Sequence, residues 1–350
     1  MLHILLTFDY ELFFNKSYFS EKEVLIDTTA LIVKSLDRMK IKGTFFVDTP
    51  CLLKYEELGL DDFPLMVERQ INGLLDDGHD IQLHFHPSWF TANYIDNEWY
   101  FDQKSYSLDR FENPSELLVR SKLKLDSLVG NKSYYKCCAF RAGGFCLTPE
   151  IEVLSTLYEL GIRLDSSVCC GVKMESTAQT FDWTDLNYVG QWRYDPSSGV
   201  RSQSISNNYM IEIPVGTYSH IPTKWWLTRC QPRLKYPPLM GMPSPVEREN
   251  KTDRFTTILN RVKSSFTTPI LFVMDNLHAN ALFFLGEYYL KASRYKNEDI
   301  YICALAHPKF SSPECVENMC DFISQIGSLS EEVDFITFRD AYNQLIDIEG

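Results

Sequence analysis

The stretch Leu2-His3-Ile4-Leu5-Leu6-Thr7-Phe8-Asp9-Tyr10-Glu11 is a nearly continuous apolar run of strand length that ends in two acidic residues. Such a run is typical of a strand buried on both faces, as in the parallel sheets of α/β proteins. Asp9 and Glu11 would then lie at the C-terminal end of this strand. In barrels of alternating strands and helices, the C-terminal strand ends carry the catalytic residues. The first ten residues or so therefore predict both a fold class and the edge where a site would form.

The same pattern, an apolar run that ends in a polar or ionisable residue, recurs along the chain. It is found at residues 43–48, 81–86, 138–141, 162–165, 211–214, 270–275 and 301–307. Amphipathic stretches, each predicting a helix laid on the strands, occupy residues 28–40, 114–129 and 149–160. Strands that alternate with helices predict a parallel α/β architecture with its chemistry at one rim.

Two histidines lie one residue apart at the end of the run at 81–86. Side chains alternate faces along a strand, so His84 and His86 would point the same way. Two imidazoles that converge on one point indicate a metal site.

Six motifs in this order resemble those of the polysaccharide deacetylases of the NodB-homology type. They are Thr7–Glu11, Gly43–Val47, Gly78–His86, Phe140–Phe145, Asp165–Ser167 and Leu305–Pro308. The resemblance covers nearly the whole chain. It implies an α/β fold, an irregular (β/α)7-type barrel of parallel strands surrounded by helices, here as a single domain over residues 1–350.

The chain departs from the family pattern at two positions. Tyr10 separates the two acids of the first motif, and residue 88, where the family has a second histidine four residues after His84, is a serine. The resemblance therefore implies Glu11, His84 and His86 as metal ligands, with His86, a water or another side chain in place of the missing histidine. The implied cofactor is a divalent metal, Zn²⁺ first, with Co²⁺ or Ni²⁺ as alternatives. Two imidazoles and one carboxylate leave coordination positions open, which is the catalytic pattern for zinc.

The resemblance also implies the catalytic residues. Asp9 would act as the general base and His307 as the general acid. Arg141 would hold Asp9 ionised, although a structural ion pair is the alternative for this arginine. Asp165 would pair with His307 or line the groove. His278 is the second candidate for the acid, because it too follows a strand-like run.

Two glycines and one further histidine carry structural expectations. Gly143 and Gly144 follow Arg141 and indicate a backbone that passes close to another group or adopts a positive φ. His79 follows a glycine at the start of a strand and is expected to make a structural hydrogen bond.

Composition and charge limit the partners and the cellular compartment that we expect for this protein. The net charge of −13 argues against nucleic acid or an anionic membrane as the main partner. No window reaches the ~18 apolar residues of a membrane-spanning helix, and Met1 leads almost directly into the first strand without a secretory signal. The ten cysteines form no C-x-x-C pattern, which favours buried free thiols in a reducing compartment. The cytoplasm is the expected location.

Two segments elaborate the predicted barrel. Residues 87–110 are dense in aromatic side chains, which would either stack on sugar rings as a lid or pack the loop onto the barrel. Residues 216–250 are rich in proline and would cover the site or mediate self-association.

The resemblance implies a metal-dependent hydrolase that removes an acetyl group from an N- or O-acetylated sugar or polysaccharide precursor. One alternative is a catalytically silent barrel that binds carbohydrate or a partner enzyme. Another is a glycoside hydrolase on a related barrel that uses Asp9 and a second carboxylate. Metal dependence separates the first hypothesis from the last.

Overall fold

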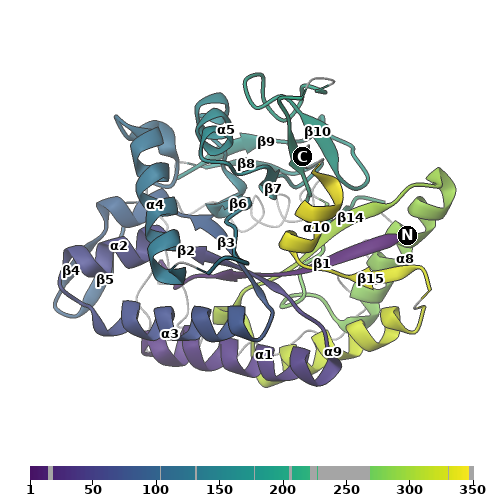
Figure 1. Cartoon of the computed structure of the whole chain (residues 1–350), viewed down its shortest axis with the longest axis horizontal. Coiled ribbons are helices and arrows are strands. Elements are labelled where there is room, and N and C mark those ends of the chain that lie inside the picture. The colour runs from purple at the N-terminus through teal and green to yellow at the C-terminus, as the bar shows by residue number, and fades with distance from the viewer. Residues whose placement is uncertain are drawn as a thin grey trace, which may run out of the picture.

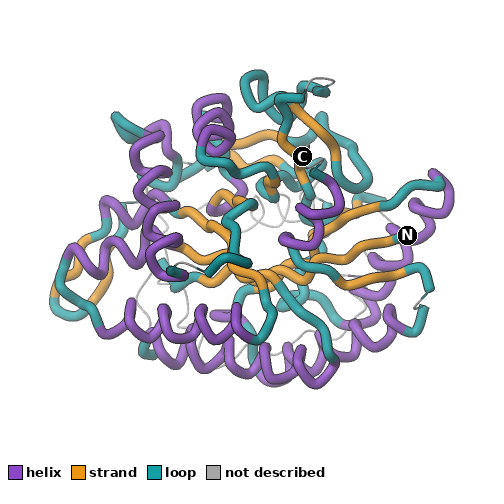
Figure 2. Tube along the Cα trace, in the orientation of Figure 1, coloured by secondary structure: helices purple, strands orange, loops and turns teal. Residues whose placement is uncertain are grey.

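The computed structural model describes residues 1–14, 19–102, 104–130, 132–176, 178–204, 207–220, 227, 269–329 and 331–346. Within these ranges one large sheet curls, and helices cover its outer side (Figures 1 and 2). Helices α1, α3 and α9 line one edge of the molecule, at the bottom of the view, and α4 and α5 lie at its upper left (Figure 1). The expected α/β barrel architecture is confirmed.

The elements of this architecture have the following bounds. The strands of the large sheet are β1 (Leu2–Tyr10), β2 (Thr44–Asp48), β3 (Asp80–Phe85), β6 (Ala139–Ala142), β7 (Leu164–Asp165), β10 (Trp192–Tyr194), β11 (Met210–Glu212), β14 (Ile300–Ala306) and β15 (Val333–Phe335). The α-helices are α1 (Thr28–Met39), α2 (Thr49–Glu57), α3 (Asp62–Asp76), α4 (Pro114–Val129), α5 (Glu150–Glu159), α8 (Ala279–Lys296), α9 (Pro313–Gly327) and α10 (Phe338–Leu345). Three small antiparallel pairs are β4 (Asn93–Ile95) with β5 (Glu98–Tyr100), β8 (Lys173–Glu175) with β9 (Thr180–Asp182), and β12 (Thr217–Tyr218) with β13 (Ile270–Leu271).

The strand order of the large sheet is β10-β11-β7-β6-β3-β2-β1-β14, and β15 also pairs with β1. Every pair except β10 with β11 is parallel, so the C-terminal ends of the strands meet at one rim. The register sets Asp48 beside His84, and His84 beside Arg141. The residues of the predicted site thus lie side by side at the C-terminal ends of neighbouring strands.

Backbone hydrogen bonds join the two sides of the curled sheet. Val215, just after β11, forms a parallel bridge with Cys303 of β14. The Gly216 N–H donates to the Cys303 carbonyl at 3.1 Å, and the Cys303 N–H donates to the Pro214 carbonyl at 3.0 Å. This contact joins the segment after β11, near one end of the strand order, to β14 at the other end, and so closes the barrel.

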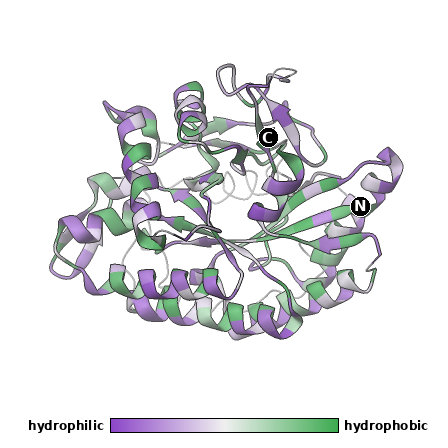
Figure 3. Cartoon of the chain, viewed as in Figure 1, coloured by the Kyte–Doolittle hydropathy of each residue, from purple (hydrophilic) through white to green (hydrophobic). Residues whose placement is uncertain are grey.

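Apolar burial follows the sequence pattern. All nine residues of β1 are buried, as expected of a strand covered on both faces. The outer helices carry hydrophobic and hydrophilic residues on different faces (Figure 3). In α1, Ile32 and Leu36 are buried against the core. Since the buried apolar side chains of strands and helices form one cluster, hydrophobic burial holds the layers together.

The strand and helix predictions are confirmed with one correction. Residues 270–275 do not form one continuous strand. Only Ile270 and Leu271 are in β13, which pairs with β12, and Val273 then forms a single bridge to Leu305 of β14. The segment changes partner at Phe272, because the Phe272 N–H donates to the Gly216 carbonyl while its own carbonyl accepts from Leu305.

The structure confirms some of the remaining predictions, and others fall on residues outside the described ranges. The Nδ1 atom of His79 accepts the Gly43 N–H at 3.1 Å, which confirms its structural hydrogen bond. Part of the aromatic segment at 87–110 forms the β4–β5 hairpin. Of the segment at 216–250, residues 221–226 and 228–250 lie outside the described residues. No helix among the described residues is both long enough and apolar enough to cross a membrane.

The close approach of β1 to the start of β2 gives a test of this packing. A Cβ atom at Gly43 would lie 2.7 Å from Phe8 Cε2 and 3.2 Å from the Leu6 carbonyl oxygen, whereas one at Gly73, in α3, would meet nothing within 4 Å. We expect Gly43→Ala to lower the free energy of unfolding by about 1–3 kcal/mol through overpacking. Gly73→Ala, the matched control, should raise it by ~0.5–1 kcal/mol because alanine favours the helix. Urea denaturation measures both; equal stability of Gly43→Ala and the wild type would contradict this packing.

Candidate active site

A carboxylate and two imidazoles converge at the rim. Glu11, just beyond β1, places Oε2 3.4 Å from His84 Nε2 and 3.1 Å from His86 Nδ1. The three side chains are buried, and one ligand atom from each lies within 4.8 Å of the others. His84 and His86 point to the same side, as the alternation along β3 predicts.

These three facing atoms make no hydrogen bond within the described part of the chain. Glu11 Oε2, His84 Nε2 and His86 Nδ1 are buried without a hydrogen-bond partner among the described residues. Buried polar atoms are normally hydrogen-bonded, so three such atoms aimed at one point require an explanation. A carboxylate oxygen with two imidazole nitrogens is a donor set that suits Zn²⁺ or a similar divalent ion. The residues present fit a metal.

Hydrogen bonds to the backbone set the orientation of His84. Its Nδ1 lies 2.8 Å from the Arg141 carbonyl oxygen, which can only accept. Nδ1 therefore carries the proton in the neutral ring, and Nε2 faces Glu11. Burial would lower the pKa of His84, but Asp9 and Glu11 raise it to about 9 in the absence of a metal. Metal-binding histidines commonly have their second nitrogen fixed in this way.

His86 is held from two sides. Its backbone N–H donates to Asp48 Oδ1 at 3.1 Å, and the other oxygen of Asp48 accepts the Trp89 indole N–H at 2.8 Å. A Cβ atom at Gly143 would lie 2.2 Å from His86 Cδ2, so only glycine leaves room for the ring. Gly144 has φ +58°. The two readings of this glycine pair, close approach and positive φ, are both confirmed, one at each residue.

Asp9 and Arg141 form a buried ion pair. Arg141 Nη1 donates to Asp9 Oδ1 at 2.6 Å, while the rest of the guanidinium donates to the backbone and hydroxyl oxygens of Ser166. Burial would raise the pKa of Asp9, but the charges of Arg141 and the nearby histidines outweigh it and lower the pKa. Asp9 is thus ionised, and its second oxygen lies 3.9 Å from His84 Nε2 and 3.8 Å from His307 Nε2.

His307 is oriented by an acid that the sequence reading missed. Asp275 Oδ2 accepts both the backbone N–H of His307, at 2.6 Å, and its ring Nδ1–H, at 2.8 Å. Burial would lower the pKa of His307, but the carboxylates of Asp275, Asp9 and Glu11 raise it. These carboxylates favour the charged imidazole, whose Nε2 faces Asp9. The sequence did contain a pattern that indicates Asp275, because this residue ends the apolar run at 270–275.

The pairing of His307 with Asp165 is wrong. The Val273–Leu305 bridge brings the end of the 270–275 segment beside β14, so Asp275 takes that position. Asp165 accepts from the Ser167 hydroxyl at 2.5 Å and the Tyr194 hydroxyl at 3.5 Å. The rival histidine, His278, is the N-cap of α8, where its Nδ1 accepts the Asn280 N–H, so the structure places His307 and not His278 beside Asp9.

Lys309 is a second residue that the sequence reading missed. It is buried, and its Nζ donates to the Leu12 carbonyl at 3.1 Å and lies 2.9 Å from Glu11 Oε1. Burial would raise the pKa of Glu11, but Lys309 first, then His86 and His84, hold it well below its usual range. Lys309 occupies one carboxylate oxygen of Glu11 and leaves the other to face the histidines. Its only sequence signal is its place two residues after His307.

The pair of Glu11 and Lys309 can be tested through stability. We expect Lys309→Met to lower the free energy of unfolding of the metal-free protein by about 3–5 kcal/mol, because Glu11 is left as an unpaired buried charge. Added Zn²⁺ should recover more stability in the variant than in the wild type, since the ion replaces the lost positive charge. Lys54→Met is the matched control, a buried lysine whose partner, Glu57, is exposed. A loss in Lys309→Met that zinc leaves unchanged would contradict the assignment.

A second group of buried acids lies apart from Glu11, His84 and His86. Glu212 of β11 is the cross-strand neighbour of Asp165, and its Oε1 accepts the Val168 N–H at 2.8 Å. Burial raises the pKa of Asp165 to about 6, and burial together with the Asp165 charge raises the pKa of Glu212 well above its usual value. At neutral pH the folded protein therefore retains a proton that the unfolded chain releases.

This pair predicts a pH-dependent stability. Because both pKa values are raised, the stability contribution is complete below the unfolded pKa values and falls as pH rises through the folded ones. Glu212→Gln keeps an oxygen for the Val168 N–H and removes the charge. We expect its stability relative to the wild type to increase from about pH 5 to pH 8 in urea denaturation. Glu175→Gln, at an exposed position, should show no such trend. If the stability difference between Glu212→Gln and the wild type does not change with pH, the folded protein does not retain the extra proton.

Comparison with known proteins supports the fold. A scan against family models and a search of curated proteins give no match. Among solved structures, a Parabacteroides distasonis protein assigned as a glycoside hydrolase/deacetylase is 9% identical, with a TM-score of 0.52 over 97% of this chain and 69% of that chain. A Mycobacterium smegmatis protein assigned as a polysaccharide deacetylase is 14% identical (TM-score 0.48; 98% and 90% covered), and the allantoinase Puue is 11% identical (TM-score 0.49; 98% and 91% covered).

The likeness to the Parabacteroides distasonis protein shows a shared fold over nearly the whole of this chain. Because one fold hosts several chemistries, an activity has to be argued from the site itself.

Proposed function

We propose that this protein is a metal-dependent hydrolase that removes the acetyl group from an N- or O-acetylated sugar or polysaccharide precursor. One observation carries the proposal. Three buried ligand atoms without a hydrogen-bond partner among the described residues, from Glu11, His84 and His86, face one another beside Asp9 and His307. A metal site flanked by a base and an acid is what hydrolysis of an amide or ester requires.

Glu11, His84 and His86 would hold the ion, and we propose Zn²⁺ as its identity. Such an ion supplies a Lewis acid for the acetyl carbonyl and lowers the pKa of water at the site toward ~7. Lys309 and Asp48 support the ligand side chains from behind.

The proton transfers belong to Asp9 and His307. Arg141 occupies Asp9 Oδ1, so Oδ2 is the oxygen that takes a proton from the attacking water as the C–O bond forms at the acetyl carbon. His307 Nε2 gives its proton to the departing amine or alkoxide, and acetate is released. The pKa of the base is lowered and that of the acid is raised, so each group starts in the protonation state that its role needs.

The glycoside hydrolase alternative fits this site less well. Such enzymes use two carboxyl groups, and the one that acts as the acid needs a raised pKa. Here Arg141 and Lys309 help to lower the pKa of both Asp9 and Glu11, so neither is kept protonated. The site favours hydrolysis of an acetyl group over cleavage of a glycosidic bond.

The thiol chemistry supports a reducing compartment, and we propose the cytoplasm. Nine described cysteines are free, and eight of them are buried, as expected where disulfides do not form. In that location the substrate would be an acetylated precursor rather than a finished cell-wall polymer.

Metal content is the first test of the proposal. We expect near-stoichiometric divalent metal in the purified wild type by plasma mass spectrometry, and its loss in His84→Ala. His278→Ala, the same substitution at the N-cap of α8, should retain the metal. Asp9→Asn should also retain it but lose about 10²–10⁴-fold in acetate release from acetylated sugars, because it removes the base.

Two outcomes would overturn the proposal. A wild-type protein that takes up no metal after incubation with zinc, cobalt or nickel would favour the silent barrel. Full acetate release by Asp9→Asn would refute the assigned base even if metal is present.

A further inference from the structure

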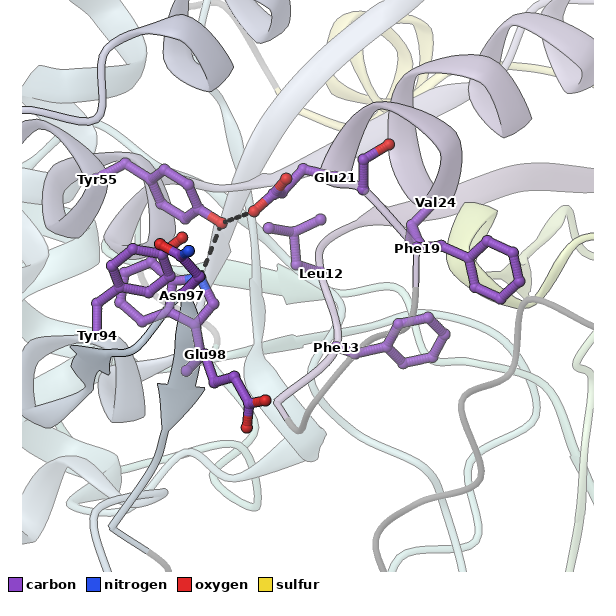
Figure 4. Close-up of a pocket in the computed structure, with 11 residues that line it drawn as sticks. Leu12, Phe13, Phe19, Glu21, Val24, Tyr55, Tyr94, Asn97 and Glu98 are labelled. Carbon is purple, nitrogen blue, oxygen red and sulfur yellow. Dashed lines mark hydrogen bonds between the residues drawn. The ribbon is translucent and has the colours of Figure 1, made fainter.

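Aromatic rings lie between the metal ligands and a cavity of about 280 Å³ (Figure 4). Trp99 in the lining of this cavity packs against the buried Trp89, and Trp89 contacts Phe14, whose ring lies against His86. The buried polar groups that reach the site through hydrogen bonds lie elsewhere, next to Arg141.

Ser166 holds the guanidinium that in turn holds the base. Arg141 Nε donates to the Ser166 carbonyl at 3.1 Å and Nη2 donates to the Ser166 hydroxyl at 2.9 Å, while Nη1 donates to Asp9 Oδ1 at 2.6 Å. The ring of Phe46 covers the guanidinium, with its centre 4.2 Å from the guanidinium carbon. Ser166 therefore sets the direction from which Arg141 meets Asp9.

Two carboxyl groups fix the turn at residues 165–168, which contains Ser166. The Ser167 hydroxyl donates to Asp165 Oδ1 at 2.5 Å, and the Val168 N–H donates to Glu212 Oε1 at 2.8 Å. The acids thus hold the two residues that directly follow Ser166. A change in either carboxyl group is passed on to the residue that holds Arg141.

The second oxygen of Glu212 indicates that a proton lies between the two acids. Oε2 is buried, and no hydrogen-bond donor among the described residues reaches it. Asp165 is the cross-strand neighbour of Glu212, and both side chains are fully buried. Two negative charges would repel each other there, whereas a proton on one carboxyl group makes it a donor to the other. The raised pKa values of both acids agree with this arrangement.

The other ionisable groups around the two acids do not supply a charge that could replace this proton. Tyr194 of β10 donates to Asp165 Oδ2 at 3.5 Å, and Glu150 of α5, which acts on Tyr194, lies 3.7 Å from Arg201. Burial raises the pKa of each remaining neighbour, so that all are neutral near pH ~7: Tyr194, Cys169, Cys170 and Cys303. The cation on the far side of Ser166 is Arg141, which is already paired with Asp9.

We propose that Asp165 and Glu212 are positioning residues for the base, because they share one proton and in that state hold Ser166 against Arg141 and so keep Asp9 in place. The proposal deepens the function proposed above and rests on it for the role of Asp9. Loss of the shared proton adds a second buried negative charge, which pushes the two acids apart and draws Arg141 away from Asp9. Asp165 then acts on the base and not on His307.

The hold on Arg141 can be observed without any substrate. The NMR signal of the Arg141 Nε–H, identified by its loss in Arg141→Lys, should exchange slowly with water because the group is buried and donates to Ser166. We expect Glu212→Gln to keep this protection, since its amide oxygen still accepts the Val168 N–H. Glu212→Leu should speed the exchange by at least about 10-fold.

Asp80→Asn is the matched control for these variants. Asp80 is also a buried acid whose pKa burial raises, to about 6, but it begins β3 and therefore lies at the opposite rim of the barrel. Its replacement should leave the exchange of the Arg141 Nε–H unchanged.

Infrared spectroscopy tests the shared proton directly. We expect the carbonyl stretch of a protonated carboxyl group in the folded wild type near pH ~7. The spectrum of Glu212→Gln should contain one protonated carboxyl group fewer.

Kinetics then connect the two acids to Asp9. For acetate release from penta-N-acetylchitopentaose we expect Glu212→Leu to lower kcat by about 10- to 100-fold with KM nearly unchanged, because the base is misplaced and the binding groups are not. Glu212→Gln should restore most of kcat. Its kcat relative to the wild type should rise with pH, since the variant has no shared proton to lose. The metal content of both variants should equal that of the wild type.

Three results would each overturn the proposal: equally slow exchange of the Arg141 Nε–H in Glu212→Leu and the wild type, equal infrared spectra of Glu212→Gln and the wild type, or equal pH profiles of their kcat. A wild type that releases no acetate while the NMR and infrared results are as expected would refute the proposed function and leave the hold on Arg141 established. If Glu212→Leu does not fold, Ser166→Ala takes its place, because it removes one acceptor of Arg141 without removing a charge.

Discussion

The buried ion pair between Asp9 and Arg141 is the contact on which the rest of the site depends. Arg141 is fully buried, so its charge has been removed from water and needs Asp9 as a partner. The guanidinium reaches from β6 to β1, past the two strands that lie between them in the sheet. The backbone carbonyl of the same arginine fixes His84. One residue thus holds both Asp9 and His84 in place.

The remaining charges of the site follow the same logic. Glu11 is paired with Lys309, and Asp275 with His307. Neighbouring cations make full ionisation of these carboxylates tolerable in a buried place. Glu11 Oε2, His84 Nε2 and His86 Nδ1, which face one another, still make no hydrogen bond within the described residues. The point that these three atoms face is where a divalent cation would bind.

Local patterns in the sequence could predict the strands and part of the site. A strand buried on both faces is a run of apolar residues, and the residue that ends the run marks the rim, so Asp9, Glu11 and His84 were accessible to that reading. The orientation of His84 and His86 followed from strand alternation alone. These features depend on neighbours in the chain, which a sequence displays directly.

The errors and omissions all concern contacts between distant segments. Asp165 and Asp275 both end an apolar run, and only the approach of residues 270–275 to β14 decides which of them meets His307. Lys309 gains its role because the loop after β14 lies against the end of β1. In the aromatic segment, composition cannot tell a core residue such as Trp89 from a pocket wall such as Trp99. In each of these cases, contacts between segments that lie far apart in the sequence decide which role the residue has.

The pairing of β1 has a consequence for biosynthesis. Leu2 pairs with Ile300 and Phe8 with Ala306. The ribosome therefore synthesises about three hundred residues after β1 before its neighbour β14 is available. Until then one edge of an apolar strand is open, and such edges promote aggregation. The partners of Glu11 and Asp9 at 307 and 309 are also made late. A nascent chain therefore needs protection along β1, and a truncated product that lacks β14 is a substrate for proteases and not a weaker enzyme.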